Sequence, residues 1–255
     1  MNDDHSRIAM MAIAAARRIT NGDTVFCGTG LPLLAAMTAK KTHAPECVVF
    51  FETGALDPDL LEIPLSVADP RVMYRSSHNG GLADAFAFMQ NKRSGSDIVG
   101  ILSSAQIDPY GNLNSTCIGD YKKPDIRLPG SGGACDVASL VGRTLIFMKH
   151  ERRRFVNELD YMTSPGWLEG GESRQEAGYI RGGPEHVITS LGVFAFDDVT
   201  KRMYLEARYD EVQIDDIERR TGFDIALDTS EVEPLPTEEE LGVLYCEVDP
   251  NRYYL

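Results

Sequence analysis

The sequence lacks several features that mark whole classes of proteins. Its 255 residues include only five cysteines, with no Cys-x-x-Cys pair, and five histidines without the His-x-x-x-His spacing of many metal sites. A zinc site, a disulfide framework and a histidine-built metal centre are therefore not expected. No apolar run approaches the ~20 residues that span a bilayer, and the acidic start of the sequence lacks the basic segment of a signal peptide. We expect a protein of the reducing cytoplasm, with no metal and no membrane contact.

Positive charge is also scarce. Lys and Arg number 25 against 39 Asp and Glu, which gives a formal net charge of −14. Nucleic acids and anionic membrane surfaces attract clustered cations, so neither is an expected partner. The sequence does hold 43% hydrophobic and 25% charged residues. That balance is typical of a folded chain long enough to bury a full core.

Apolar runs and helix-forming segments alternate over the first 150 residues. This order predicts βαβ units and an α/β fold, in which helices flank a mostly parallel sheet. The predicted helices lie at residues 8–19, 33–41, 82–91 and 135–141, and the predicted strands at 24–27, 47–51, 98–102 and 144–148.

The last hundred residues follow a different pattern. Residues 193–196 and 203–205 predict an antiparallel hairpin around the turn 197–201. A short helix is expected at 215–220, and Thr237 and Glu240 have the spacing of a helix capping box. We interpret residues 1–255 as a single domain with an antiparallel addition near its C-terminal end.

Glu52 is the most informative single residue. It follows the apolar run 47–51, and ligands of open parallel sheets bind beyond the carboxyl ends of the strands. A partly desolvated carboxylate there can act as a general base or as a nucleophile, or it can simply accept local backbone N–H groups. Gly54, two residues later, allows a sharp turn or a close approach of a ligand.

Two glycine-rich segments also follow or precede predicted elements. Gly28 and Gly30 stand between a strand and a helix, and Gly132 and Gly133 precede another helix. Both segments can present backbone amides to an anion, or they can serve only helix packing and helix starts. Leu33 stands where a dinucleotide-binding fingerprint has its third glycine.

The segment 106–115 is rich in amide and hydroxyl side chains. It follows the predicted strand 98–102, so these side chains are candidates for substrate contact. Asn and Ser also form turns by bonding their own backbone, and both alternatives stay open for the candidate residues Gln106, Asn112, Asn114 and Ser115.

Other conspicuous residues are interpreted as structural. The cysteines are expected to fill core space. His150 begins the segment His-Glu-Arg-Arg-Arg, which we interpret as a solvated or subunit-facing charge network. Trp167 is either an interface anchor or part of the core.

Taken in order, these segments resemble the β subunits of the two-subunit family I CoA-transferases, of the glutaconate CoA-transferase type. The resemblance covers nearly the whole chain, and its most specific part is the block 105–116. The segments that carry it are GTGLPL (28–33), ETG (52–54), AQIDPYGNLNST (105–116), IGDY (118–121), GSGGA (130–134), HERRRF (150–155) and DYMTSPGW (160–167).

The resemblance implies covalent catalysis by Glu52. Its carboxylate would attack an acyl-CoA thioester, and a glutamyl-CoA thioester would then pass CoA to a second carboxylic acid of the dicarboxylic, glutaconate-like class. Acyl-CoA esters are the implied substrates, and no cofactor is bound permanently. Residues expected to bind CoA or substrate, or to stabilise oxyanions, are Gly28, Gly30, Gly54, Gln106, Asn112, Asn114, Ser115, Gly132 and Gly133.

The resemblance also implies a partner. Such β subunits work with an α subunit of similar size that carries its own glycine-rich loop, as a heterotetramer with two copies of each chain. Thr53 departs from the Ser or Asn more usual beside the glutamate, which leaves the acid substrate open. The alternatives are an acyl-CoA hydrolase or decarboxylase with Glu52 as base, and a non-catalytic ligand-binding subunit.

Overall fold

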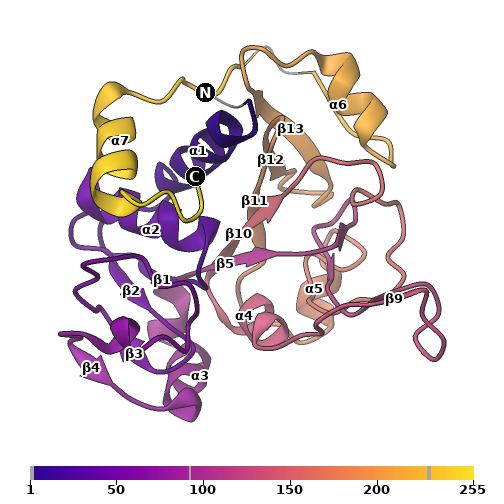
Figure 1. Cartoon of the computed structure of the whole chain (residues 1–255). Helices are drawn as coiled ribbons and strands as arrows, with labels where there is room; N and C mark the ends of the chain where they lie inside the picture. Colours follow the sequence, from indigo (N-terminus) through magenta and orange to yellow (C-terminus); the bar gives the residue numbers. More distant parts are fainter. Residues whose placement is uncertain (1–2, 92, 229–230) are drawn as a thin grey trace. The chain divides into compact units, whose positions relative to one another are not determined.

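The computed structural model describes residues 3–91, 93–228 and 231–255 (Figure 1). The chain forms two compact units: unit 1 contains Met1–Ile101 and Leu235–Leu255, and unit 2 contains Leu102–Pro234. The expectation of a single domain stays a prediction. Among the described residues, no helix has both the length and the apolar character needed to cross a membrane.

Unit 1 is built around short buried strands. Strand β1 pairs in parallel with both β2 and β5, and β2, β3 and β4 then continue antiparallel. The strands are β1 (Thr24–Phe26), β2 (Val48–Phe50), β3 (Ala55–Leu56), β4 (His78–Asn79) and β5 (Ile98–Ser103, whose last two residues belong to unit 2).

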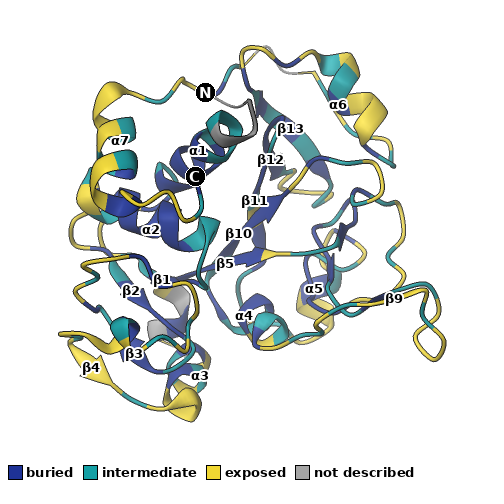
Figure 2. Ribbon diagram, viewed as in Figure 1, coloured by how far each residue is buried: buried dark blue, intermediate teal, exposed yellow. Residues whose placement is uncertain are grey.

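The helices of unit 1 come from both ends of the chain. Figure 2 shows α2 and the strands β1, β2 and β5 with many buried residues in dark blue. The helices are α1 (Asp3–Ala16), α2 (Leu31–Lys41), α3 (Leu82–Gln90) and α7 (Glu238–Val243), with 3₁₀ turns at Pro70–Met73 and Ser94–Asp97 and a π-helical turn at Leu244–Val248.

The longer strands of unit 2 form one parallel and two antiparallel pairings. Strands β10 and β11 are parallel, and β11, β12 and β13 form an antiparallel meander. The strands are β10 (Arg143–Met148), β11 (Pro184–Thr189), β12 (Gly192–Phe196) and β13 (Met203–Arg208), with two small hairpins, β6 (Gln106–Ile107) with β7 (Leu113–Asn114) and β8 (Cys117–Ile118) with β9 (Ile126–Arg127). The helices are α4 (Ala134–Leu140), α5 (Ser173–Glu176) and α6 (Ile214–Arg220).

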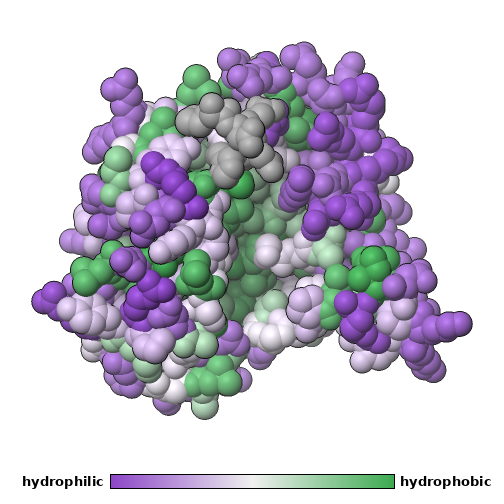
Figure 3. Space-filling model, viewed as in Figure 1, coloured by the Kyte–Doolittle hydropathy of each residue, from purple (hydrophilic) through white to green (hydrophobic). Residues whose placement is uncertain are grey.

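The predicted α/β class is confirmed, with parallel strands, flanking helices and the antiparallel hairpin of β12 and β13. Hydrophilic residues, in purple, cover much of the face seen in Figure 3, as the 25% of charged residues leads one to expect. The capping box at Thr237 and Glu240 is also present.

Some details of the sequence interpretation are wrong. The first helix spans Asp3–Ala16 rather than 8–19. Cys246 is exposed and Cys135 only partly buried, so not every cysteine fills core space. His150 is buried and stands apart from the charge network, which Glu151 forms with Arg153 and Arg154.

Candidate active site

Glu52 lies at the corner of a tight turn that joins β2 to β3. The Gly54 N–H donates to the Phe51 carbonyl at 2.9 Å, and the Phe51 N–H donates to the Ala55 carbonyl at 3.0 Å. These bonds close the turn and leave Glu52 and Thr53 half-exposed. The turn follows the carboxyl end of β2, which is the position that the sequence predicts for the glutamate.

Gly54 is required by the shape of this turn. Its φ of 94° lies in the left-handed region, and a Cβ built there would stand 2.5 Å from the carbonyl carbon of Gly80. The Gly80 N–H donates to the Gly54 carbonyl at 2.9 Å. The turn is therefore seated directly on the backbone that follows β4, and a side chain at position 54 has no room.

The Gly28 and Gly30 loop lies at the same edge of the unit 1 strands. β1 and β2 are parallel with Phe26 opposite Phe50, so the chain leaves both strands on one side, toward Gly28 in one case and Glu52 in the other. Gly30 precedes α2 with a φ of 83° and has no side chain to cap the first helical turn. Unit 1 thus brings Gly28, Gly30 and Glu52 to one edge.

The amide side chains of unit 2 are engaged within the chain. Asn114 donates through Nδ2 to the Gln106 Oε1 atom and to the Cys117 carbonyl, both at 2.7 Å. Gln106 donates through Nε2 to an Asp160 carboxylate oxygen at 2.7 Å. Both amides are buried, so they form a network that joins β6, β7 and the segment around Asp160.

Asn112 is similarly saturated. Its Nδ2 donates to Asp108 Oδ2 at 2.7 Å and to the Leu168 carbonyl at 2.8 Å, and its Oδ1 accepts the N–H groups of Gly166 and Leu168. Burial raises the pKa of Asp108, although hydrogen bonds from Asn112 and Tyr110 act in the opposite direction. The contacts of Asn112 and Asn114 favour the loop-forming alternative over substrate contact.

Ser115 ties this loop to the glycine-rich segment. Its hydroxyl donates to the Gly130 carbonyl at 2.9 Å, and its N–H donates to Thr163 Oγ1 at the same distance. Gly132 is exposed, with no heavy atom within 4 Å of a built Cβ, and Gly133 directly precedes α4. Unit 2 therefore brings Ser115 close to the glycine segment and leaves the amides of Gly132 open to solvent.

The local sequence pattern does not reveal two polar side chains that order unit 2, Asp160 and His150. Asp160 holds Gln106 in place, and the motif around it gave a signal only through the resemblance. His150 stacks on Phe155 with ring centroids 4.1 Å apart and contacts Thr189 and Thr221 through its two ring nitrogens. Burial lowers the pKa of His150 to about 3, so this imidazole is neutral.

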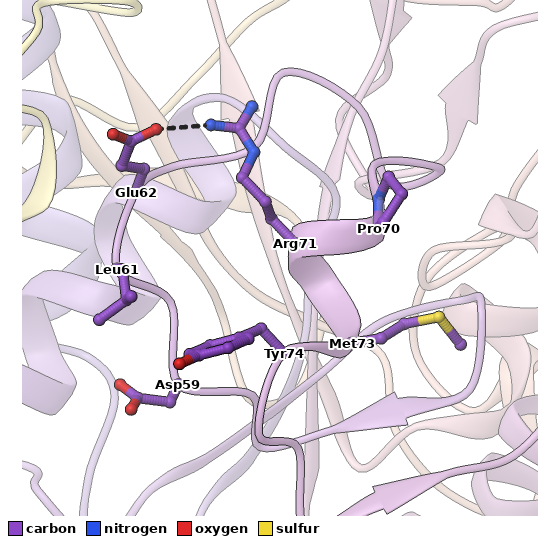
Figure 4. Close-up of a pocket in the computed structure, with 7 residues that line it drawn as sticks. All are labelled: Asp59, Leu61, Glu62, Pro70, Arg71, Met73 and Tyr74. Atoms are coloured by element: carbon purple, nitrogen blue, oxygen red, sulfur yellow. Dashed lines mark hydrogen bonds and ion pairs between the residues drawn. The ribbon is translucent and has the colours of Figure 1, made fainter.

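A cavity of about 510 Å³ in unit 1 contains none of the predicted site residues (Figure 4). Its polar rim is internally paired, because Arg71 contacts Glu62 at 2.8 Å and Asp69 at 2.7 Å. The residues that line it are Asp59, Leu61, Glu62, Pro70, Arg71, Met73 and Tyr74.

Neither a metal-binding cluster nor a catalytic role for the two thiols nearest the β1 and β2 strands is indicated in the described parts of the chain. Within them, no group of three or more His, Cys, Asp or Glu side chains is placed to hold a metal ion. Cys27 and Cys47 are buried, and burial raises the pKa of both thiols, that of Cys47 to about 11. Neither is a thiolate at neutral pH.

Comparisons with known proteins show similarity along nearly the whole chain. The model of the family "Coenzyme A transferase" matches residues 8–219. One subunit of glutaconate CoA-transferase from Acidaminococcus fermentans is 39% identical over 252 residues, covering 96% of this chain and 93% of that protein. One subunit of 3-oxoadipate CoA-transferase from Pseudomonas knackmussii is 35% identical, covering 94% of this chain and 92% of that protein.

The fold agrees as well. A crystal structure of the Acidaminococcus fermentans glutaconate coenzyme A-transferase matches with a TM-score of 0.94 at 39% identity, over 97% of this chain and 96% of that one. The resemblance found in the sequence motifs is confirmed. The chain therefore belongs to the coenzyme A transferase family.

Proposed function

We propose that this chain is the glutamate-bearing subunit of an enzyme that moves CoA between an acyl-CoA and a carboxylic acid of the dicarboxylic, glutaconate-like class. The observation that carries the proposal is the place of Glu52 at the corner of the β2–β3 turn. It is half-exposed and stands at the strand edge that also bears Gly28 and Gly30. The names of the two related transferases, for glutaconate and 3-oxoadipate, support the acid class.

The proposed reaction passes activation between carboxyl groups. The Glu52 carboxylate attacks the thioester carbonyl, the C–S bond breaks, and a mixed anhydride and CoA thiolate form. The thiolate attacks the glutamyl carbonyl and releases the first acid as its carboxylate, which leaves a glutamyl-CoA thioester. The carboxylate of the second acid attacks this thioester and expels the thiolate. Attack of that thiolate on the new acyl carbonyl gives the second acyl-CoA and frees Glu52.

Each step places negative charge on a carbonyl oxygen, which backbone amides can stabilise. We assign this role to the amides around Gly28 and Gly30, which stand at the strand edge that bears Glu52, and, as the family resemblance implies, to those around Gly132 and Gly133, of which Gly132 is exposed. Gln106 borders the site in this proposal. Asn112, Asn114 and Ser115 act by holding the loops, since their polar groups are bonded within the chain.

The proposal includes a partner subunit and no permanently bound cofactor. Both relatives are named as one subunit of a transferase, so we expect a second kind of subunit, the α subunit, to complete the enzyme as a heterotetramer in the cytoplasm. CoA esters are then substrates and leave the protein in each cycle.

Mass spectrometry of the assembled enzyme tests the mechanism. After incubation with acyl-CoA and no acceptor acid, this chain should gain the mass of CoA, and peptide mapping should place the adduct on Glu52. Glu52→Gln should show neither adduct nor transfer. Full transfer by Glu52→Gln would overturn the covalent mechanism, and release of free CoA or CO₂ without an acceptor would favour hydrolysis or decarboxylation.

A further inference from the structure

Glu52 lies in the turn at one end of the hairpin formed by β2 and β3, and the Lys40 side chain contacts the chain at the other end. β2 and β3 pair antiparallel with Phe50 opposite Leu56, and the Asp57 N–H extends the ladder by donating to the Val49 carbonyl at 2.6 Å. The paired hairpin therefore runs from Val49 to Asp57, with Glu52 in the turn between its strands, and Cys47 directly precedes β2. A contact that joins Asp57 to the backbone at Cys47 restricts how these two strands move relative to each other.

Asp57 adopts a backbone conformation that few residues accept. Its φ of 49° lies in the left-handed region, which costs a non-glycine residue free energy and is better tolerated by Asp and Asn than by other side chains. Its Oδ1 atom is buried and has no hydrogen bond of good geometry among the described residues. Such a carboxylate needs a cation beside it, since a buried unpaired charge is unfavourable.

Lys40 supplies that cation and connects Asp57, at the end of the hairpin, to the backbone just before β2. Its Nζ stands 2.9 Å from Asp57 Oδ1 and donates to the Cys47 carbonyl at 2.6 Å. The two side chains are only 23% and 29% exposed, so solvent screens the contact less than it screens a surface pair. Lys40 belongs to the last turn of α2, the helix that Gly30 starts. One helix thus connects the glycine loop to the glutamate hairpin.

We propose that Lys40, acting through Asp57 and the Cys47 carbonyl, is a positioning residue that holds the Glu52 turn in the geometry needed for attack on the thioester. The inference rests on the proposed covalent role of Glu52. Lys40 touches no reacting atom in this scheme. Its contribution is to restrict the hairpin, and reactions of positioned groups are sensitive to displacements of about 1 Å.

The test measures formation of the Glu52 adduct in a single turnover of the assembled enzyme. Lys40→Met keeps the aliphatic stem and removes the charge, and Asp57→Asn keeps a residue that tolerates the left-handed conformation. We expect either change to slow adduct formation about 10-fold while KM for acyl-CoA stays within about 2-fold. Lys40→Arg keeps a cation at this place and should recover most of the rate.

The neighbouring lysine provides a matched control. Lys41 lies in the same helical turn and pairs with Glu247 at 3.3 Å, away from the hairpin. Lys41→Met removes the same charge from the chain and should form the adduct at the wild-type rate. Melting temperatures of all variants show whether a slower rate merely follows from lost stability.

The outcomes separate this inference from the mechanism on which it rests. If the wild-type enzyme forms no adduct, both proposals fail. If it forms the adduct and Lys40→Met and Asp57→Asn form it at the same rate, only the positioning role is overturned. Equal slowing by Lys41→Met would also overturn it, because the effect would then come from net charge. If Lys40→Met does not fold, Asp57→Asn and Lys40→Arg still decide the question.

Discussion

The backbone conformation of Gly54 limits which residues can occupy this position in the turn that carries Glu52. A Cβ at this position would stand 2.5 Å from the Gly80 carbonyl carbon, and φ is 94°. We expect Gly54→Ala to lower the free energy of unfolding by about 2–4 kcal/mol, because both the strain and a backbone clash oppose the native turn. Urea denaturation measures this.

Gly28→Ala is the matched control for Gly54→Ala. Gly28 also follows a strand, but no heavy atom lies within 4 Å of its built Cβ and its φ is outside the left-handed region. The free energy of unfolding of the Gly28→Ala variant should differ from that of the wild type by less than about 1 kcal/mol. Equal losses in the two variants would contradict the role assigned to the Gly80 contact.

His150 links burial to pH. Its pKa falls to about 3 from an ordinary 6.5 because of burial, with a smaller effect of the Arg220 charge. Between these values the unfolded chain binds a proton that the folded chain does not, so acidification favours unfolding. The neutral His150 imidazole therefore makes its full contribution to the free energy of unfolding above about pH 6.5. That contribution is lost as the pH falls toward 3, and the free energy of unfolding then decreases by at most about 1.4 kcal/mol per pH unit.

Urea unfolding of the wild type and His150→Gln at about pH 7 and about pH 5 checks this expectation. Stability of the wild type should fall more steeply with acidification than that of the variant, which has no imidazole to protonate. An NMR titration in which the folded His150 imidazole becomes charged near its ordinary pKa would contradict the prediction.

For single residues, the sequence predicts where Glu52 lies but not which groups bond the amide side chains of Gln106 and Asn112. A carboxylate after an apolar run has a predictable place at a strand end. Gln106, in contrast, is held by Asp160, and Asn112 by the backbone around Leu168. Those partners lie more than fifty positions away, and no local pattern reveals such a bond.

The longer elements were predictable because their hydrophobic patterns are strong. The apolar runs before Glu52 and after Asp97 become β2 and β5, which are largely buried. The sequence pattern does not predict β11 because Glu185 and His186 interrupt its apolar residues; Glu185 pairs with Arg143, and the His186 ring lies 3.4 Å from Glu206. The two-residue strands β6 to β9 depend on pairing with each other and carry too little pattern to detect.

The start of α7 shows how a cap can be tested. Thr237 Oγ1 accepts the Glu240 N–H at 3.1 Å, and the Glu240 carboxylate accepts the Thr237 N–H at 2.7 Å. Thr237→Ala should cost about 1 kcal/mol, since one orphan amide loses its partner. In chemical denaturation, the exposed Glu239→Ala in the same turn should lose less than about 0.5 kcal/mol of unfolding free energy. Similar losses in both variants would mean that the cap does not stabilise α7.

For the molecule as a whole, the net charge of −14 sets a condition on any CoA ester. Such ligands carry phosphates, so the overall field of this chain opposes their approach. Backbone amides escape this conflict because they attract oxyanions without adding net charge. The glycine loops of the proposed site, together with a partner subunit, are therefore the natural places for capture.

The division into two units predicts how the chain opens. Residues 235–255 return to unit 1, where the Tyr254 hydroxyl donates to the Pro64 carbonyl at 3.1 Å and its ring lies 3.8 Å from the built Cβ of Gly30. The buried carboxylate of Asp249 orders this end by accepting the N–H groups of Tyr253, Tyr254 and Leu255. Removing that carboxylate leaves three amides without their acceptor.

Hydrogen exchange of Asp249→Ala in the full chain tests this division. We expect faster exchange in residues 250–255 and in the Gly30 loop, while the strands β10 to β13 of unit 2 keep their protection, because local opening follows cooperative units. The exposed Asp210→Ala should leave both regions unchanged. Equal loss of protection in both units after Asp249→Ala would show that they open as one cooperative body. In that case the contacts at the C-terminal end would control the stability of the whole chain rather than the order of the glycine loop alone.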